Sequence, residues 1–79
     1  MTKHVIVSEE RADKSVHLAD ADTRYKRTAI LKPMRLISMN PWLVEHVNTV
    51  GTVVLTTYHT YWSSAEEQGL KWVETGEPL

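Results

Sequence analysis

Cysteine is absent from the whole chain of 79 residues. This absence excludes a disulfide framework, a thiolate zinc site and a cysteine nucleophile. A chain without cysteine suits the reducing interior of a cell, so we expect a cytoplasmic protein. No apolar run approaches the ~20 residues that a membrane-spanning helix needs. The N-terminal sequence MTKHVIVSEE reaches acidic residues too soon for a signal peptide, so we expect no membrane contact.

Glycine, and the motifs built on it, are also scarce. The three glycines stand far apart, at positions 51, 69 and 76, so no glycine-rich loop can cradle a phosphate. No GxSxG elbow supports a serine hydrolase, although Ser63, Ser64 and His59 supply the residue types. The adjacent carboxylates of Glu9–Glu10 and Glu66–Glu67 would not face one cleft. We therefore expect no enzyme activity and no cofactor.

The four histidines lack the spacing of a metal site. Imidazole ligands on a helix usually lie three or four residues apart. Here neighbouring histidines are at least 13 residues apart, as from His4 to His17 and from His46 to His59. With no thiolates and no carboxylate motif beside them, they are interpreted as isolated surface or half-buried side chains. The sequence predicts no metal centre.

Phenylalanine is missing too, so three tryptophans and three tyrosines supply all the aromatic bulk. With 42% hydrophobic and 24% charged residues, the composition is that of a folded domain and not of a disordered chain. We expect one small domain over residues 1–79, with a tail at 75–79 that frays because it contains Gly and Pro. A domain of this size buries only ~60% of its unfolded surface, so its margin of stability is thin.

The segment 40–51 has the local signals of a helix. Asn40 can accept hydrogen bonds from the free amides of a first turn, and Pro41 suits the first helical position. Gly51 falls where a helix can end in a left-handed residue. The apolar stripe, spaced at i, i+4 and i+7, consists of Leu43, Val47 and Val50. These signals predict a helix at about 41–50.

The segment 52–62 has the composition of a strand. It contains Val, Thr, Tyr, Leu, His and Trp, and no Gly, Pro or charged residue. Such β-branched and aromatic residues pack well on a pleated surface. Neither face of the predicted strand is plainly polar, which is typical of a strand covered on both sides. We predict that one face near Tyr58–Trp62 meets a second subunit, a partner, or a curled part of the same sheet.

The rest of the chain adds mostly short strands. We predict strands at 3–8, 15–19 and 24–31, a short helix at 65–68 ended by Gly69, and a last strand at 70–74. Pro33 cannot donate to a central ladder and marks an edge, a bulge or the end of the third strand. The order β-β-β-α-β-(short α)-β predicts an α+β fold, with a mostly antiparallel sheet of four to five strands and the helix at 41–50 packed on it. A winged helix would need a second clear helix before residue 40 and is disfavoured.

Positive charge is concentrated in one segment. Residues 24–35 carry five basic residues and no acidic one, although the net charge of the chain is −1. Such a segment can attract phosphates or an acidic protein partner, or it can protect an edge strand from aggregation. The acidic overall balance argues against non-specific nucleic-acid binding. The candidate partner-binding residues are Arg24, Lys26, Arg27 and Arg35, with Tyr58 and Tyr61 from the long strand.

These features favour a small non-catalytic binding module that docks on a larger protein as a regulator or inhibitor. Small size, a lack of motifs and segmented charge are typical of the proteins that phages and mobile elements use to bind and inhibit a host machine, a comparison of class only. One alternative is a nucleic-acid-binding protein that uses the basic run 24–35. Another is a homodimer whose second copy covers the exposed face of the sheet.

Overall fold

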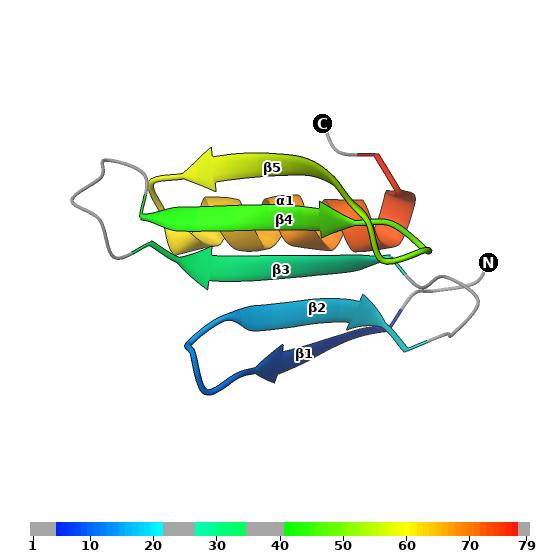
Figure 1. The fold of residues 1–79 in the computed structure, drawn as a ribbon, viewed down its shortest axis with the longest axis horizontal. Helices are drawn as coiled ribbons and strands as arrows, with labels where there is room; N and C mark the ends of the chain where they lie inside the picture. The colour runs from blue at the N-terminus through cyan, green and yellow to red at the C-terminus, as the bar shows by residue number, and fades with distance from the viewer. Residues whose placement is uncertain (1–4, 22–26, 35–40, 78–79) are drawn as a thin grey trace.

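The predicted α+β class is confirmed by the computed structural model, which describes residues 5–21, 27–34 and 41–77. One helix packs on a five-stranded antiparallel sheet (Figure 1). The elements are β1 (Ile6–Glu10), β2 (Val16–Asp20), β3 (Thr28–Pro33), β4 (Trp42–Val47), β5 (Val53–His59) and α1 (Trp62–Thr75). The strands form a meander in which each pairs with the next in the chain, in the order β1-β2-β3-β4-β5.

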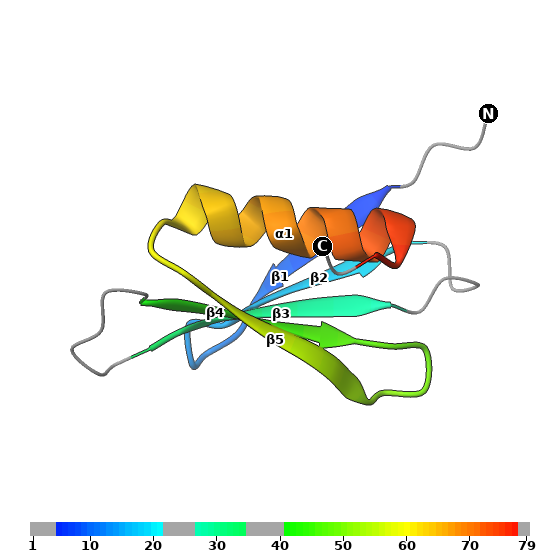
Figure 2. The ribbon, with the colours of Figure 1, turned by 90° about the horizontal axis from the view of Figure 1, so that it is seen from above.

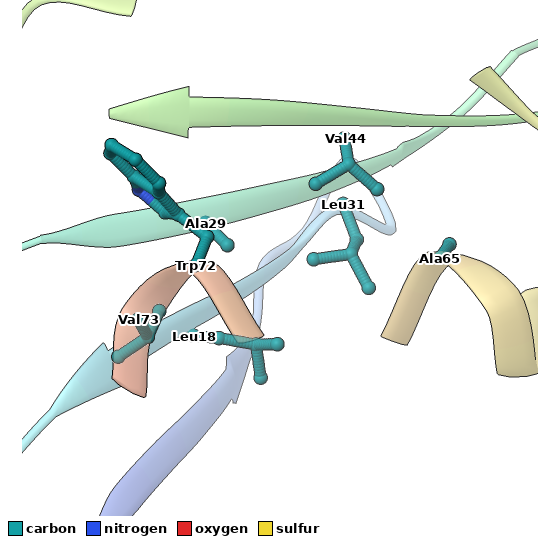
Figure 3. Packing of buried hydrophobic residues seen from close by; sticks show 7 residues of the cluster. All are labelled: Leu18, Ala29, Leu31, Val44, Ala65, Trp72 and Val73. Carbon is teal, nitrogen blue, oxygen red and sulfur yellow. The ribbon is translucent and has the colours of Figure 1, made fainter. Parts of the chain in front are cut away.

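The helix lies across one face of the sheet, and Figure 2 shows the two layers from the side. Seven buried hydrophobic side chains, contributed by β2, β3, β4 and α1, fill the space between the layers (Figure 3). They are Leu18, Ala29, Leu31, Val44, Ala65, Trp72 and Val73. No helix in the described part of the chain is long and apolar enough to cross a membrane.

The predicted helix at 41–50 is wrong, because these residues form β4 and the turn after it. Val44 and His46 point to the helix layer and are fully buried. Every second residue of this segment therefore faces the helix, as in a strand, and pairing with β3 and β5 holds it in that conformation. The side chain of Asn48 accepts hydrogen bonds from the amides of Val50 and Thr52. Gly51, with a φ of 85°, therefore serves a tight turn between strands and not the end of a helix.

The predictions after residue 52 are partly confirmed. The long strand predicted at 52–62 is present as the shorter β5, Val53–His59, and its last predicted residue, Trp62, begins α1. The short helix at 65–68 and the strand at 70–74 are wrong, since a single 14-residue helix covers both. Gly69 lies buried inside that helix, where an added Cβ would stand 3.0 Å from side-chain atoms of Leu18 and Leu31. Glycine here permits close approach of helix and sheet instead of ending the helix.

The three N-terminal strands are confirmed with shifted bounds. The predictions 3–8 and 15–19 correspond to β1 and β2, and 24–31 corresponds to β3. Residues 3–4 and 24–26 lie outside the described part of the chain. Pro33 is the last residue of β3, where its missing amide interrupts no further pairing of the strand. The predicted order of elements is therefore corrected to β-β-β-β-β-α.

Gly76 ends α1. It has a φ of 72°, and its amide donates to the carbonyl of Trp72 over 2.8 Å. This is the left-handed termination that glycine makes without steric strain. The fraying of 75–79 stays a prediction: Thr75 is the last residue of the helix, and residues 78–79 lie outside the described range.

Candidate protein-binding surface

The face of the sheet opposite α1 is the first candidate surface. Within the described residues no element packs on it, because the only helix lies on the other side (Figure 2). Register and alternation bring an apolar set to this face: Val7, Ala19, Ile30, Leu43, Val47, Val53 and Tyr58. Lys32 and Glu45 form an ion pair among them, with a 2.6 Å separation of nitrogen and oxygen. The face is thus mixed, with apolar residues and paired charge side by side.

The two edges of the sheet differ in charge. The sequence of β1 is IVSEE, and Glu9 forms an ion pair with Arg11 at 3.3 Å. The sequence of β5 is VVLTTYH, with no acidic residue, lysine or arginine. Charged side chains on an edge strand oppose its pairing with another chain. The edge of β1 carries that protection, and the edge of β5 lacks it.

Exposed apolar groups gather along β5 and its continuation. Of the seven exposed large hydrophobic residues in the described part of the chain, four lie between residues 53 and 61. They are Val53, Val54, Tyr58 and Tyr61. Tyr58 is 56% exposed and Tyr61, just before α1, is 71% exposed. Of the two tyrosines predicted as contact residues, Tyr58 thus lies on the uncharged edge strand, and Tyr61 lies in the connection from β5 to α1.

Of the four basic residues predicted for the same surface, only Arg27 lies in the described part of the chain, and its guanidinium contacts the helix. Arg24, Lys26 and Arg35 lie outside the described residues. Arg27 reaches the end of α1, where its Nε donates to the carbonyl of Trp72 over 3.1 Å and its Nη2 donates to the carbonyls of Val73 and Glu74 over 3.0 and 3.1 Å. The guanidinium thus shares the carbonyl of Trp72 with the amide of Gly76, adds a donor to the carbonyls of Val73 and Glu74, and complements the helix dipole. Sequence reasoning missed this role because it depends on a contact across 45 residues.

We expect Arg27→Gln to destabilise the domain by about 1–2 kcal/mol, because three hydrogen bonds to a charged donor are lost or weakened. Arg27→Lys should recover only part of this, since an ammonium cannot reproduce the planar fork. Urea denaturation followed by circular dichroism measures both. The control is Lys71→Gln, which removes a charge from an exposed position of the same helix. Equal stability of Arg27→Gln and the control would contradict the capping role.

His46 is a fully buried imidazole between sheet and helix. Its Nδ1 lies 3.0 Å from the carbonyl oxygen of Leu55, and its Nε2 lies 3.0 Å from Nε2 of Gln68. Because a carbonyl can only accept, Nδ1 carries the proton and Nε2 accepts from the Gln68 amide. The ring also contacts Trp72 edge to face, with centroids 5.5 Å apart. This neutral tautomer is fixed by its surroundings and functions as a core residue.

The remaining described histidines contact hydroxyl groups. His59 Nδ1 lies 2.9 Å from Ser64 Oγ, and its Nε2 lies 2.8 Å from Thr57 Oγ1. The contact with Ser64 joins the end of β5 to the first turn of α1, and the contact with Thr57 lies within β5. His17 Nε2 lies 3.3 Å from Ser15 Oγ, whose proton is donated to Asp13 over 2.6 Å. Among the residues that the structure describes, no group of three or more His, Asp or Glu side chains could hold a metal ion.

Acid is expected to destabilise the fold through His46. Burial lowers the pKa of His46 below its ordinary value of 6.5, and burial also lowers the pKa of His59. The unfolded chain therefore binds more protons than the folded one as the pH falls through 6.5, and stability is lost with falling pH. Each unit by which the pKa of His46 is lowered corresponds to about 1.4 kcal/mol.

Urea denaturation at pH 7.5 and pH 5.5 measures this loss. The loss of stability between the two pH values should be smaller in His46→Gln, which lacks the buried imidazole. It should largely persist in His59→Gln, which retains the imidazole of His46. A loss of the same size in His46→Gln and in the unmodified protein would contradict the assignment.

Comparison with known proteins gives no further information on the chain: no protein-family model, no curated protein and no solved structure matches it.

Proposed function

We propose that this protein is a small non-catalytic binding module that docks on a larger protein and regulates or inhibits it. The observation that carries the proposal is the edge of β5, which is uncharged and bordered by exposed apolar side chains. In the described part of the chain no strand pairs with this edge. Its outward backbone amides and carbonyls match an extended segment of a partner.

Strand addition explains how such a small surface can bind. Backbone hydrogen bonds along the added strand supply affinity, and the side chains that alternate beside it supply specificity. Tyrosine is one of the residue types that often carry interface energy, and both Tyr58, in β5, and Tyr61, in the connection from β5 to α1, are exposed. The basic residues Arg24, Lys26 and Arg35 remain proposed contacts that steer an acidic partner.

The finer assignments are part of the same proposal. At the level of class, the protein is proposed as an accessory protein of a phage or mobile element that acts on a host machine, on the grounds of its small size and segmented charge. A cytoplasmic location rests on the absence of cysteine. Nucleic-acid binding by the run 24–35 remains the weaker alternative, because the guanidinium of Arg27 is engaged at the end of α1.

The test compares two substitutions of the same chemistry at two exposed valines. Val54→Lys places a charge on the β5 edge, where Val54 is 51% exposed. Val50→Lys places the same charge in the β4–β5 turn, where Val50 is 80% exposed. Proteins captured from the native host are identified by mass spectrometry for the unmodified protein and for both variants.

We expect one larger protein to be captured by the unmodified chain and by Val50→Lys, and to be lost with Val54→Lys. Affinity of that purified partner should fall at least about tenfold with Val54→Lys, because a lysine on an edge strand opposes pairing. Both variants should unfold at nearly the same urea concentration as the unmodified protein. Capture that is equal for all three proteins would show that the β5 edge is not the contact.

A homodimer is the second candidate, and the sequence of β5 favours it specifically. An antiparallel pair of β5 strands centred on Thr56 would place Val54 opposite Tyr58 and would bring no like charges together. Light scattering at increasing protein concentration distinguishes this case. A doubled mass that Val54→Lys abolishes would assign the edge to a second copy of this chain.

A further inference from the structure

A groove on the helix-covered side of the sheet is separate from the β5 edge. It lies at the end of the sheet where the β1–β2 hairpin meets the start of α1, and it has a volume of about 580 Å³. Its lining residues are Glu10, Asp13, Lys14, Val16, Pro33, Trp42 and Trp62. A volume of this size falls within the range of ligand-binding clefts.

Two indole rings form the apolar part of the groove. Trp42 and Trp62 stand edge to face, with ring centroids 4.7 Å apart and an interplanar angle of 62°. Both pack on the core yet remain partly exposed, as does Val16, and Pro33 beside them is also partly exposed. Each indole is held in place by its partner and by the core. The arrangement offers a preformed aromatic surface, and the face of an indole attracts cations more strongly than other aromatic rings do.

Carboxylates border the same groove. Glu10 has no ion-pair partner among the described residues. Asp13 accepts hydrogen bonds from the hydroxyl and the amide of Ser15, and these bonds lower the pKa of Asp13. Lys14 is the only positive charge in the lining, so acidic groups outnumber it two to one. The electrostatic balance at this rim favours a cation.

We propose that this groove binds an arginine side chain presented by a protein partner. The planar guanidinium stacks on indole rings and pairs with carboxylates. Its apolar stem lies against Val16 and Pro33, as long cationic side chains do on apolar surfaces. The source of the arginine rests on the proposed docking function, but the preference of the groove for a guanidinium does not. Partner binding at the β5 edge would then be joined by a second, charge-selective contact.

The test uses two short capped peptides, acetyl-Gly-Arg-Gly-amide and acetyl-Gly-citrulline-Gly-amide. Citrulline has nearly the same shape as arginine and no charge. Each peptide is titrated into ¹⁵N-labelled protein at low ionic strength, and the indole Nε1–H signals are followed. Trp72 is an internal reference, because it is buried and donates to the carbonyl of Val47 over 3.1 Å.

We expect the arginine peptide to shift the Trp42 and Trp62 signals with a dissociation constant in the millimolar range, and to leave Trp72 unchanged. The citrulline peptide should bind at least about fivefold more weakly, because it lacks the cation. Glu10→Gln should weaken binding of the arginine peptide about two- to fivefold. The matched control Glu67→Gln, on the exposed side of α1, should not.

Absence of any shift at Trp42 and Trp62 would overturn the proposal, and so would equal shifts from the two peptides. Val54→Lys distinguishes this failure from a failure of the proposed function, since it alters the β5 edge and leaves the groove intact. Arginine-peptide binding should be the same in Val54→Lys and in the unmodified protein.

Discussion

Replacing Trp72 by alanine is expected to lower the free energy of unfolding by about 3–5 kcal/mol, the usual cost of removing a buried Trp. Trp72 is only 5% exposed and packs with the core of β2, β3 and β4 (Figure 3). Its indole also donates to the carbonyl of Val47 and contacts the ring of His46. Alanine would leave a cavity, an unpaired carbonyl and an imidazole without its aromatic neighbour.

Small domains have a total stability of about 5–15 kcal/mol, so this loss should leave Trp72→Ala largely unfolded at modest urea concentrations. Urea denaturation followed by circular dichroism measures it. The control is Tyr61→Ala, which removes an aromatic ring that is 71% exposed and should change stability by less than about 0.5 kcal/mol. Similar losses of unfolding free energy for the two variants would show that Trp72 does not stabilise the core more than an exposed aromatic residue does.

Gly69→Val has the second largest expected effect, a loss of about 3 kcal/mol, at the upper end of the cost of overpacking. A single Cβ at this position would already stand 3.0 Å from Leu18 and Leu31 and 3.2 Å from Cβ of Ala29. The leucine ends can rotate away, but the methyl group of Ala29 is fixed to the strand. Two further methyl groups would push α1 away from the sheet.

Gly69→Ala tests the same contact more gently. The change gains about 1 kcal/mol of helix propensity, and the displacement of the neighbouring side chains offsets this gain, so stability should change little. Glu67→Val controls for the cost of a β-branched residue in a helix, because Glu67 is exposed. Urea denaturation measures all three variants. A loss for Gly69→Val no larger than that of Glu67→Val would contradict the close approach.

The strands were predictable to the extent that alternation was locally unambiguous. β1, β2 and β3 were found with shifted bounds, because polar and turn-forming residues separate short apolar runs. The segment 42–47 contains two patterns at once. Leu43 and Val47 lie at helical spacing, whereas Trp42, Val44 and His46 alternate as in a strand. Pairing with β3 and β5 decides between them, and that pairing is not a local property.

The C-terminal helix was divided in the prediction because Gly69 resembles a stop signal. In the structure Gly69 lies where a side chain would collide with residues of β2 and β3. This contact is a feature of the tertiary structure and cannot be read from the local sequence. The candidate surface stays a prediction, but two features on which it rests can be read from the sequence. The lack of charge at 52–62 and the tyrosines at 58 and 61 are visible in the sequence, and both tyrosines are exposed in the structure.

The sequence by itself determined the α+β fold class, through several short strands, among them one without acidic residues, lysine or arginine near residue 55, and the absence of cysteine. Only the tertiary structure decided that this strand is the last in the sheet, that Arg27 binds the end of α1, and that Trp42 meets Trp62 beside two carboxylates. Residue composition and the alternation of apolar and polar residues are properties of neighbouring positions, so both can be read from the sequence. An edge, a cap and a groove are made by residues distant in sequence, and folding alone brings these together.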